Sequence, residues 1–270
     1  MAKSNNYNEL DFEALLTELG DNSNTLSLGG YKFKELTMQD QRKILSMGFN
    51  PIEIPVRMSN MHNEYIKSSV EIEDDPVDIM SHVGVDIKPY IILALRILTL
   101  GEKYVDGDTG RKYTLRKVTD ADFKKVVEPR IIELNDFIIR LGVPSLSKDT
   151  SINTQLLNAL SPFKKNIKDE DYGKIADIYQ MYELMKYITE IELKGNVFDF
   201  ERCPVNKKMK IINSFPQRVI AQISDYVEVV KANENEALTM IDDETQEESK
   251  VTIDALFYSK FARDSKEPKK

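Results

Sequence analysis

The sequence predicts an α+β fold, a helix-rich body with small antiparallel strands and hairpins, arranged as two lobes with an N-terminal arm. Two observations predict this class. Apolar residues recur at helical spacing in several stretches, most clearly in "SFPQRVIAQISDYVEVV". Between them, short alternating segments such as "YKFKEL" adjoin turns rich in Gly and Asp, which is the pattern of strands and hairpins.

The chain divides by composition into four predicted parts. Residues 1–27 are an N-terminal arm, and residues 28–150 are a mixed α/β lobe. Residues 151–258 are a C-terminal lobe of helices and strands, and residues 259–270 are a polar tail. The boundary between the lobes is placed in the polar, loosely patterned stretch 145–168.

The arm carries a short amphipathic helix. In "LDFEALLTELG", Leu15, Leu16 and Leu19 lie on the apolar side, and the turn-forming segment "GDNSNTLS" follows. Such a helix is marginal alone because helix nucleation is costly. It therefore has to dock on the body of its own chain or on a partner, and the three leucines are candidate interface residues.

The first lobe begins with a half-buried strand, in which Tyr31 and Phe33 alternate with lysines. Thr37 is placed to cap a helix that continues to about Ser46. The segment "NPIEIPV" after it is predicted to be an extended connector, because each proline restricts the residue before it.

Two prolines open the next helices. Pro76 starts a short one, and Pro89 starts a helix that is apolar nearly all round and is therefore expected at the centre of the core. A hairpin follows near 103–118. A long helix is then predicted over 119–140, with Pro129 kinking or breaking it.

The second lobe alternates helix and strand. "DYGKIADIYQMYELMKY" predicts a strong helix, and "NVFDFERCPVNKKMKII" predicts a strand at 197–200, a turn and a second strand. The helix that starts at "SFPQR" and a closing strand at 251–257 would complete a small α+β unit.

The helix that starts at "SFPQR" has two different faces. Val219 and Ile223 belong to a single apolar stripe, which is predicted to pack on the sheet. Arg218, Gln222 and Asp225 lie off the stripe and are predicted to face outward. These three polar residues are candidate interface residues.

The motifs nominate no catalytic, cofactor-binding or metal-binding residue. "DGDTG", starting at Asp106, resembles the opening of a calcium loop, but its sixth and twelfth positions are Arg111 and Lys117 instead of Gly and Glu, so a hairpin turn is expected. His62 and His82 are the only histidines and have no zinc-site spacing. Phosphate-binding glycine loops and a GxSxG elbow are also absent from the sequence, which disfavours an enzyme.

The composition is that of an ordinary soluble protein, with 41% hydrophobic and 30% charged residues. The formal net charge is −8, so no global basic field favours nucleic acid, and the basic run with Lys207, Lys208 and Lys210 is expected to be a solvated face. Cys203 is the only cysteine, so an internal disulfide is impossible. The apolar runs are far shorter than the roughly 20 residues that span a bilayer. No nucleic acid, membrane or cofactor is expected as a partner.

The helix beginning "SFPQRVIAQISDYVEVV" and the closing "VTIDALFYS", over roughly residues 200–258, together resemble the baseplate hub subunit family of T4-like contractile-tailed phages. The segment "GGYKFKELTMQDQRKIL", within 28–46, is similar to leading segments of phage tail baseplate and assembly proteins. The resemblance implies a non-enzymatic structural component of the virion's tail baseplate, a hub or wedge-joining subunit made in the host cytoplasm.

The resemblance also implies the partners. They would be other phage tail and baseplate proteins, and the chain would be present in many copies in a symmetric assembly. Two alternatives stay open: a transient tail or baseplate assembly chaperone, and an unrecognised hydrolase. A carboxylate cluster lining a deep pocket would support the hydrolase.

Overall fold

Helices and three small antiparallel sheets make up the part of the chain that the computed structural model describes, which is residues 23–45, 50–106, 109–135, 137–164, 167–252 and 256–257. The predicted α+β class is confirmed. The helices are α2 (Met38–Leu45), α3 (Ile54–Ser69), α4 (Ile79–His82), α5 (Lys88–Leu100), η1 (Asp122–Lys124), α6 (Leu146–Leu160), η2 (Ser161–Phe163), α7 (Asp169–Tyr187), α8 (Val205–Asn213) and α9 (Gln217–Ala237). The strands are β1 (Thr25–Leu28), β2 (Tyr31–Lys34), β3 (Val70–Ile72), β4 (Lys103–Val105), β5 (Lys112–Leu115), β6 (Arg130–Leu134), β7 (Phe137–Leu141), β8 (Ile188–Leu193), β9 (Asn196–Asp199), β10 (Thr239–Asp242) and β11 (Glu248–Lys250).

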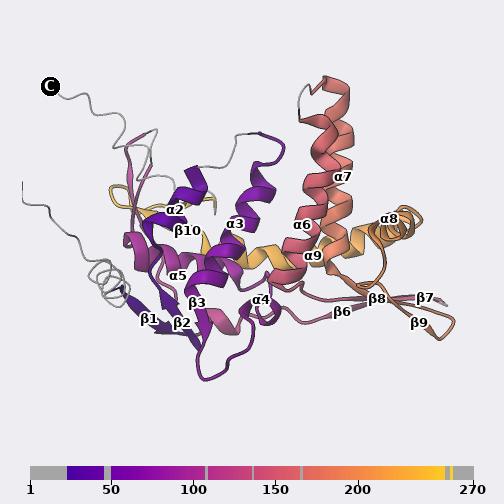
Figure 1. The fold of residues 1–270 in the computed structure, drawn as a ribbon, viewed down its shortest axis with the longest axis horizontal. Coiled ribbons are helices and arrows are strands. Elements are labelled where there is room, and N and C mark those ends of the chain that lie inside the picture. The colour runs from indigo at the N-terminus through magenta and orange to yellow at the C-terminus, as the bar shows by residue number, and fades with distance from the viewer. Residues whose placement is uncertain are drawn as a thin grey trace, which may run out of the picture.

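The three sheets lie in different parts of the molecule. Their strand orders are β1-β2-β3, β11-β10-β5-β4 and β6-β7-β8-β9, and neighbouring strands are antiparallel. Figure 1 shows the β1–β3 sheet toward one end and the β6–β9 sheet extending at the other. The α6–α7 pair rises beside the β6–β9 sheet, and α9 runs between the two ends.

The first hairpin turns at two glycines with positive φ, Gly29 and Gly30. A Cβ atom at Gly29 would lie 2.2 Å from Cδ2 of Phe123, so only glycine fits there. In β2, Tyr31 and Phe33 are buried while the lysines between them are exposed, which confirms the predicted alternation.

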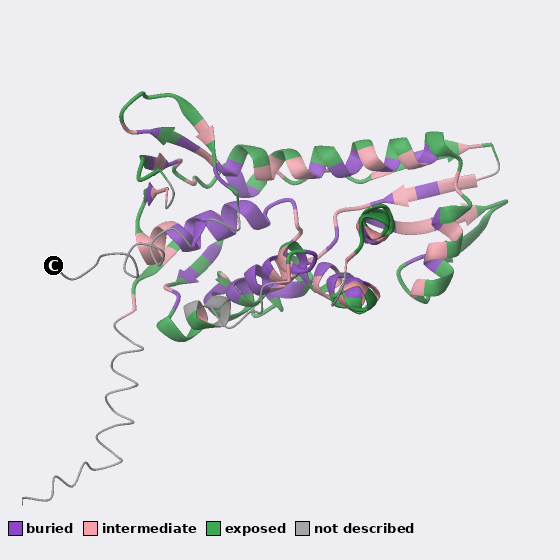
Figure 2. Ribbon diagram, turned by 90° about the horizontal axis from the view of Figure 1, so that it is seen from above, coloured by how far each residue is buried: buried purple, intermediate pink, exposed green. Residues whose placement is uncertain are grey.

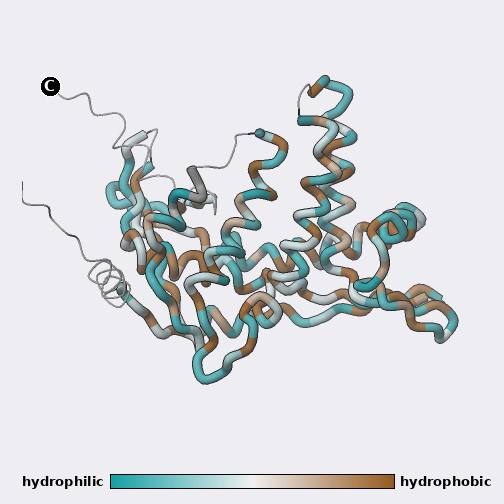
Figure 3. Tube along the Cα trace, viewed as in Figure 1, coloured by the Kyte–Doolittle hydropathy of each residue, from teal (hydrophilic) through white to brown (hydrophobic). Residues whose placement is uncertain are grey.

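Helix α5 is the centre of the first hydrophobic cluster. Its first nine residues are buried on every side, as the sequence predicts, and the helix packs with residues of β2, α3 and β10. Figure 3 shows the hydrophobic residues concentrated in these inner segments, whereas most outer turns are hydrophilic. Arg96 is buried within α5, and its guanidinium donates hydrogen bonds to the carbonyl oxygens of Gly101 (2.6 Å) and Lys103 (3.2 Å).

Helices α6, α7 and α9 form the second hydrophobic cluster with the β6–β9 sheet. Val219, Ile223, Val227 and Val230 bury one side of α9, and Figure 2 shows the other side exposed. The predicted direction of the apolar stripe is therefore confirmed. In the described part of the chain, no helix combines the length and the hydropathy needed to cross a membrane.

The long helix predicted over 119–140 is wrong. The chain forms only the short helix η1 there, followed by the β6–β7 hairpin, whose turn includes Asn135 at φ 47°. Pro129 removes a helical hydrogen bond and keeps its predecessor extended, and the apolar residues that follow it pair across strands.

Two other predicted elements are also wrong, and a stretch that was expected to be loosely patterned is a helix. Helix α6 occupies the stretch proposed as a lobe boundary, because Ser145 caps it by accepting a hydrogen bond from the Lys148 N–H at 3.3 Å. The predicted connector contains the start of α3, with Pro55 in the first turn, where its missing N–H costs nothing. Helix α8 replaces the second strand predicted after 197–200.

The C-terminal strands pair with the first half of the chain. β10 pairs with β5 as well as with β11, so this sheet crosses the predicted division at residue 150. β11 ends at Lys250, before the closing strand predicted at 251–257, of which residues 253–255 lie outside the described residues. The division into two lobes stays a prediction.

Candidate functional site

The predicted interface residues of α9 share one exposed face. Arg218, Gln222 and Asp225 are all exposed, at helical spacing, on the side opposite the buried Val219 and Ile223. Their part in an interface stays a prediction. The other three candidates, Leu15, Leu16 and Leu19, lie outside the described residues, as does nearly all of the predicted arm.

A second exposed surface was not predicted from the sequence. All four residues of β9 are exposed, including Val197 (61%) and Phe198 (46%), and Leu193 at the end of β8 is 52% exposed. β9 is the last strand of its sheet and pairs only with β8 among the described strands. We call Leu193, Val197 and Phe198 the β9 edge patch, in which Leu193 and Phe198 project from one face of the sheet and Val197 from the other. The sequence indicates a strand here. Its residue pattern does not reveal whether another element covers the strand or leaves it exposed.

The segment that resembles a calcium loop connects two hairpin strands, and its residues 107–108 lie outside the described residues. The N–H of Thr109 donates to the Asp106 carboxylate at 2.7 Å, and Gly110 donates to the Asp106 carbonyl at 2.9 Å. β4 and β5 pair on either side of it. Throughout the described ranges, no group of three or more His, Cys, Asp or Glu side chains could hold a metal ion.

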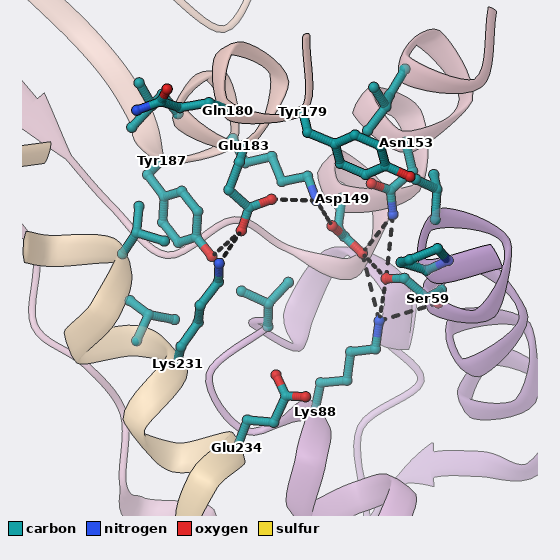
Figure 4. Close-up of a pocket in the computed structure, with 18 of the residues that line it drawn as sticks. Ser59, Lys88, Asp149, Asn153, Tyr179, Gln180, Glu183, Tyr187, Lys231 and Glu234 are labelled. Atoms are coloured by element: carbon teal, nitrogen blue, oxygen red, sulfur yellow. Dashed lines mark hydrogen bonds and ion pairs between the residues drawn. The ribbon is translucent and has the colours of Figure 1, made fainter. Parts of the chain in front are cut away.

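A cavity of about 610 Å³ lies between five helices, α3, α5, α6, α7 and α9. Charged side chains from four of these helices line it. They are Lys88 of α5, Asp149 of α6, Glu183 and Lys186 of α7, and Glu228, Lys231 and Glu234 of α9. Figure 4 shows Lys231 reaching Glu183 and Lys88 reaching Asp149. Sequence reasoning missed this site, because its residues lie up to about 150 positions apart and each has an ordinary helical setting.

The charges alternate along a chain of ion pairs. Lys231 lies 3.3 Å from one Glu183 oxygen, and Lys186 lies 3.0 Å from the other. Lys186 also lies 2.8 Å from Asp149 Oδ1, and Lys88 lies 3.6 Å from Asp149 Oδ2. We call these five residues the ion chain. Its ion pairs link α9 to α7, α7 to α6, and α6 to α5, in the space between these helices.

Hydrogen bonds from α3 and from α6 itself complete the surroundings of Asp149. Its Oδ2 accepts from the Ser59 hydroxyl (3.1 Å), the Asn63 amide (3.0 Å) and the Asn153 amide (3.2 Å). The Lys88 ammonium in turn donates to the carbonyl (3.1 Å) and hydroxyl (2.9 Å) of Ser59. A buried carboxylate with this many donors is strongly held in its ionised form.

The ionisation states follow from these contacts. Burial alone would raise the pKa of Asp149, but Lys186, Lys88 and the hydrogen bonds lower it below its ordinary value. Burial would likewise raise the pKa of Glu183, but Lys186 and Lys231 lower it below its ordinary value. Burial would lower the pKa of Lys186, yet Asp149 and Glu183 raise it. Both carboxylates are therefore ionised at neutral pH.

His62 is buried beside the ion chain and lines the cavity. Burial and the nearby charge of Lys88 lower its pKa to about 3, so the imidazole is neutral at physiological pH. Among the described residues, neither ring nitrogen has a hydrogen-bond partner. The ring packs against Tyr65 and Phe257. His82, by contrast, is exposed.

Chemically, the ion chain is suited to holding helices together. Four carboxylates line the cavity, those of Asp149, Glu183, Glu228 and Glu234, which is the feature that a hydrolase would need. Lysines keep Asp149 and Glu183 ionised, so neither of these two is poised to donate a proton at neutral pH. The α9 face and the β9 edge patch are the exposed features on which a binding function can rest. No family model, no curated protein and no solved structure matches this chain.

Proposed function

We propose that this chain is a non-enzymatic structural component of a phage tail baseplate, which joins neighbouring subunits through protein–protein interfaces. The observation that carries the proposal is the β9 edge patch, where a sheet edge and large apolar side chains are exposed together. The resemblance of the C-terminal segment to baseplate hub subunits supplies the class of partner. That resemblance rests partly on the helix predicted to start at "SFPQR", which is present in the structure as α9.

An exposed apolar edge strand is unfavourable in a protein that works alone. Its outer N–H and C=O groups are open to pairing with any other strand, and soluble proteins usually protect such edges with charges, prolines or a covering element. In β9 the central residues are Val197 and Phe198 instead. Addition of a strand from a neighbouring subunit would pair the backbone groups and bury these side chains.

The exposed face of α9 provides a second contact of different chemistry. Arg218, Gln222 and Asp225 carry both charge signs and an amide, which suits the polar rim of an interface. Helix α9 packs against β6 of the same sheet that ends in β9, so both surfaces belong to one hydrophobic cluster. A subunit that joins two neighbours needs two such surfaces.

The composition of purified tails tests the proposal. A structural subunit remains in intact tails at a fixed copy number relative to the other baseplate proteins, and quantitative mass spectrometry of purified particles measures that ratio. A chain present during infection but missing from finished particles would instead be an assembly chaperone. A copy number that varies between preparations would also contradict the structural role.

A further inference from the structure

A second groove, of about 740 Å³, lies where α6, α8 and the segment after β9 meet. It shares no lining residue with the cavity of the ion chain. Its polar lining consists mainly of hydroxyl and ammonium groups. The residues used below are Ser145, Ser147, Lys148, Ser151, Glu201 and Lys208.

Lys208 is a buried cation without a carboxylate partner in the described part of the chain. Only 4% of the residue is exposed, and its ammonium donates one hydrogen bond, to the Glu201 carbonyl at 3.0 Å, while lying 5.4 Å from the centre of the Phe200 ring. Buried charges in proteins are normally paired. Its neighbours in the basic run, Lys207 and Lys210, are exposed as expected, so Lys208 is the exception to the predicted solvated face.

Lys148 brings a second ammonium group to the same place. It donates to the Ile188 carbonyl at 3.3 Å and to the Glu201 carboxylate at 2.6 Å. Both lysines therefore converge on Glu201, one at its carboxylate and the other at its carbonyl. The Glu201 side chain is 51% exposed, so its carboxylate can turn into water and leave Lys148 to another anion.

The rest of the groove offers further donors for an anion. Ser147 and Ser151 add hydroxyl groups that can donate, and Ser145 marks the N-terminal end of the 15-residue helix α6. The N-terminal end of a helix attracts negative charge. This attraction adds to that of the two lysines, and the site does not depend on it. With Lys148, Lys208 and Glu201 ionised, these three groups leave one positive charge uncompensated.

We propose that this groove binds the phosphate group of a small molecule, with Lys208 and Lys148 as its charged donors and the serine hydroxyls as neutral ones. A tetrahedral oxyanion has enough acceptor oxygens to reach both ammonium groups and a hydroxyl at once. Bound there, it supplies the counter-charge that Lys208 lacks. The proposal goes beyond the baseplate role and does not depend on it.

The test uses the full chain and inorganic phosphate as the probe, titrated calorimetrically at constant ionic strength. The chain and its Lys207→Met variant should bind phosphate saturably at one site, whereas Lys208→Met should bind about tenfold more weakly or not at all, as expected for the loss of a charge-assisted hydrogen bond. Methionine keeps an apolar stem over Phe200, and the melting temperature reports whether each variant folds. Lys148→Met provides a second variant if Lys208→Met does not fold, and should also weaken binding.

The thiol of Cys203, which lines the groove, gives an independent readout. Phosphate, but not acetate at equal ionic strength, should slow its labelling by a thiol reagent in the chain and in Lys207→Met. Equal phosphate binding by folded Lys208→Met and Lys207→Met would overturn the proposal, as would a lack of saturable phosphate binding. Binding of an oligonucleotide without binding of free phosphate would also overturn it, in favour of a nucleic-acid surface.

Discussion

Asp149 is the residue through which the ion chain reaches the most helices. It belongs to α6, yet its carboxylate contacts Ser59 and Asn63 of α3, Lys88 of α5 and Lys186 of α7. Both lysines are buried. Among the described residues Lys88 has its ion pair with this carboxylate alone, whereas Lys186 also pairs with Glu183. Removing the charge would leave the buried Lys88 without its ion pair and Lys186 with Glu183 alone.

The change Asp149→Asn should therefore lower the free energy of unfolding by about 3–5 kcal/mol, the usual cost of breaking a buried ion pair. Denaturant unfolding measures the difference. Asp177→Asn, at an exposed position of α7, is the matched control and should change stability by less than about 0.5 kcal/mol. Equal losses in the two variants would show that the ion chain contributes nothing specific.

The same residue predicts how stability depends on pH. The pKa of Asp149 is lower in the folded chain than its ordinary value near 4, so between the two values the unfolded chain binds more protons. Its contribution is fully present above about pH 4 and is lost as the pH falls through the folded pKa. Unfolding free energies measured from pH 6 downward should fall less steeply in Asp149→Asn than in the unchanged chain. Parallel curves would contradict this.

At the scale of elements, the helices with continuous periodicity could be predicted and the mixed segments could not. α5, α7 and α9 each show their apolar pattern over several turns, so the sequence predicts them well. The hairpin β6–β7 was predicted as helix because its isoleucines and leucines fit either period until the partner strand β8 is known. α6 was missed because its polar residues hide an apolar side that only packing on α3 and α7 reveals.

Helix α9 is the element on which core and surface separate most clearly. Ile223 is fully buried, so Ile223→Ala should cost about 2–5 kcal/mol of unfolding free energy. Arg218→Glu, on the exposed face, should shift the melting temperature by no more than about a degree or two, while weakening capture of tail proteins from infected cells. A tolerated Ile223→Ala would contradict the packing. Unchanged capture by Arg218→Glu would remove this face from the interface.

At the scale of the whole molecule, the surfaces and cavities arise from segments that the sequence keeps far apart. The cavity of the ion chain joins residues from Pro55 to Glu234, and the second groove joins residues from Ser81 to Lys208. No local sequence pattern predicts which of these distant residues come together, since most of them are ordinary polar residues on helices. The predicted interface face of α9 could be found because it depends only on helical spacing. The β9 edge patch could not, because its exposure depends on how the sheet ends.

The central claim is that the β9 edge joins this chain to a neighbouring subunit. A reconstruction of the assembled tail tip, at a resolution that separates strands, tests it most directly. The account predicts a strand of another subunit along Asn196–Asp199, with Val197 and Phe198 covered. A tail tip in which this chain is present but the β9 edge faces solvent, with both side chains uncovered, would contradict the account.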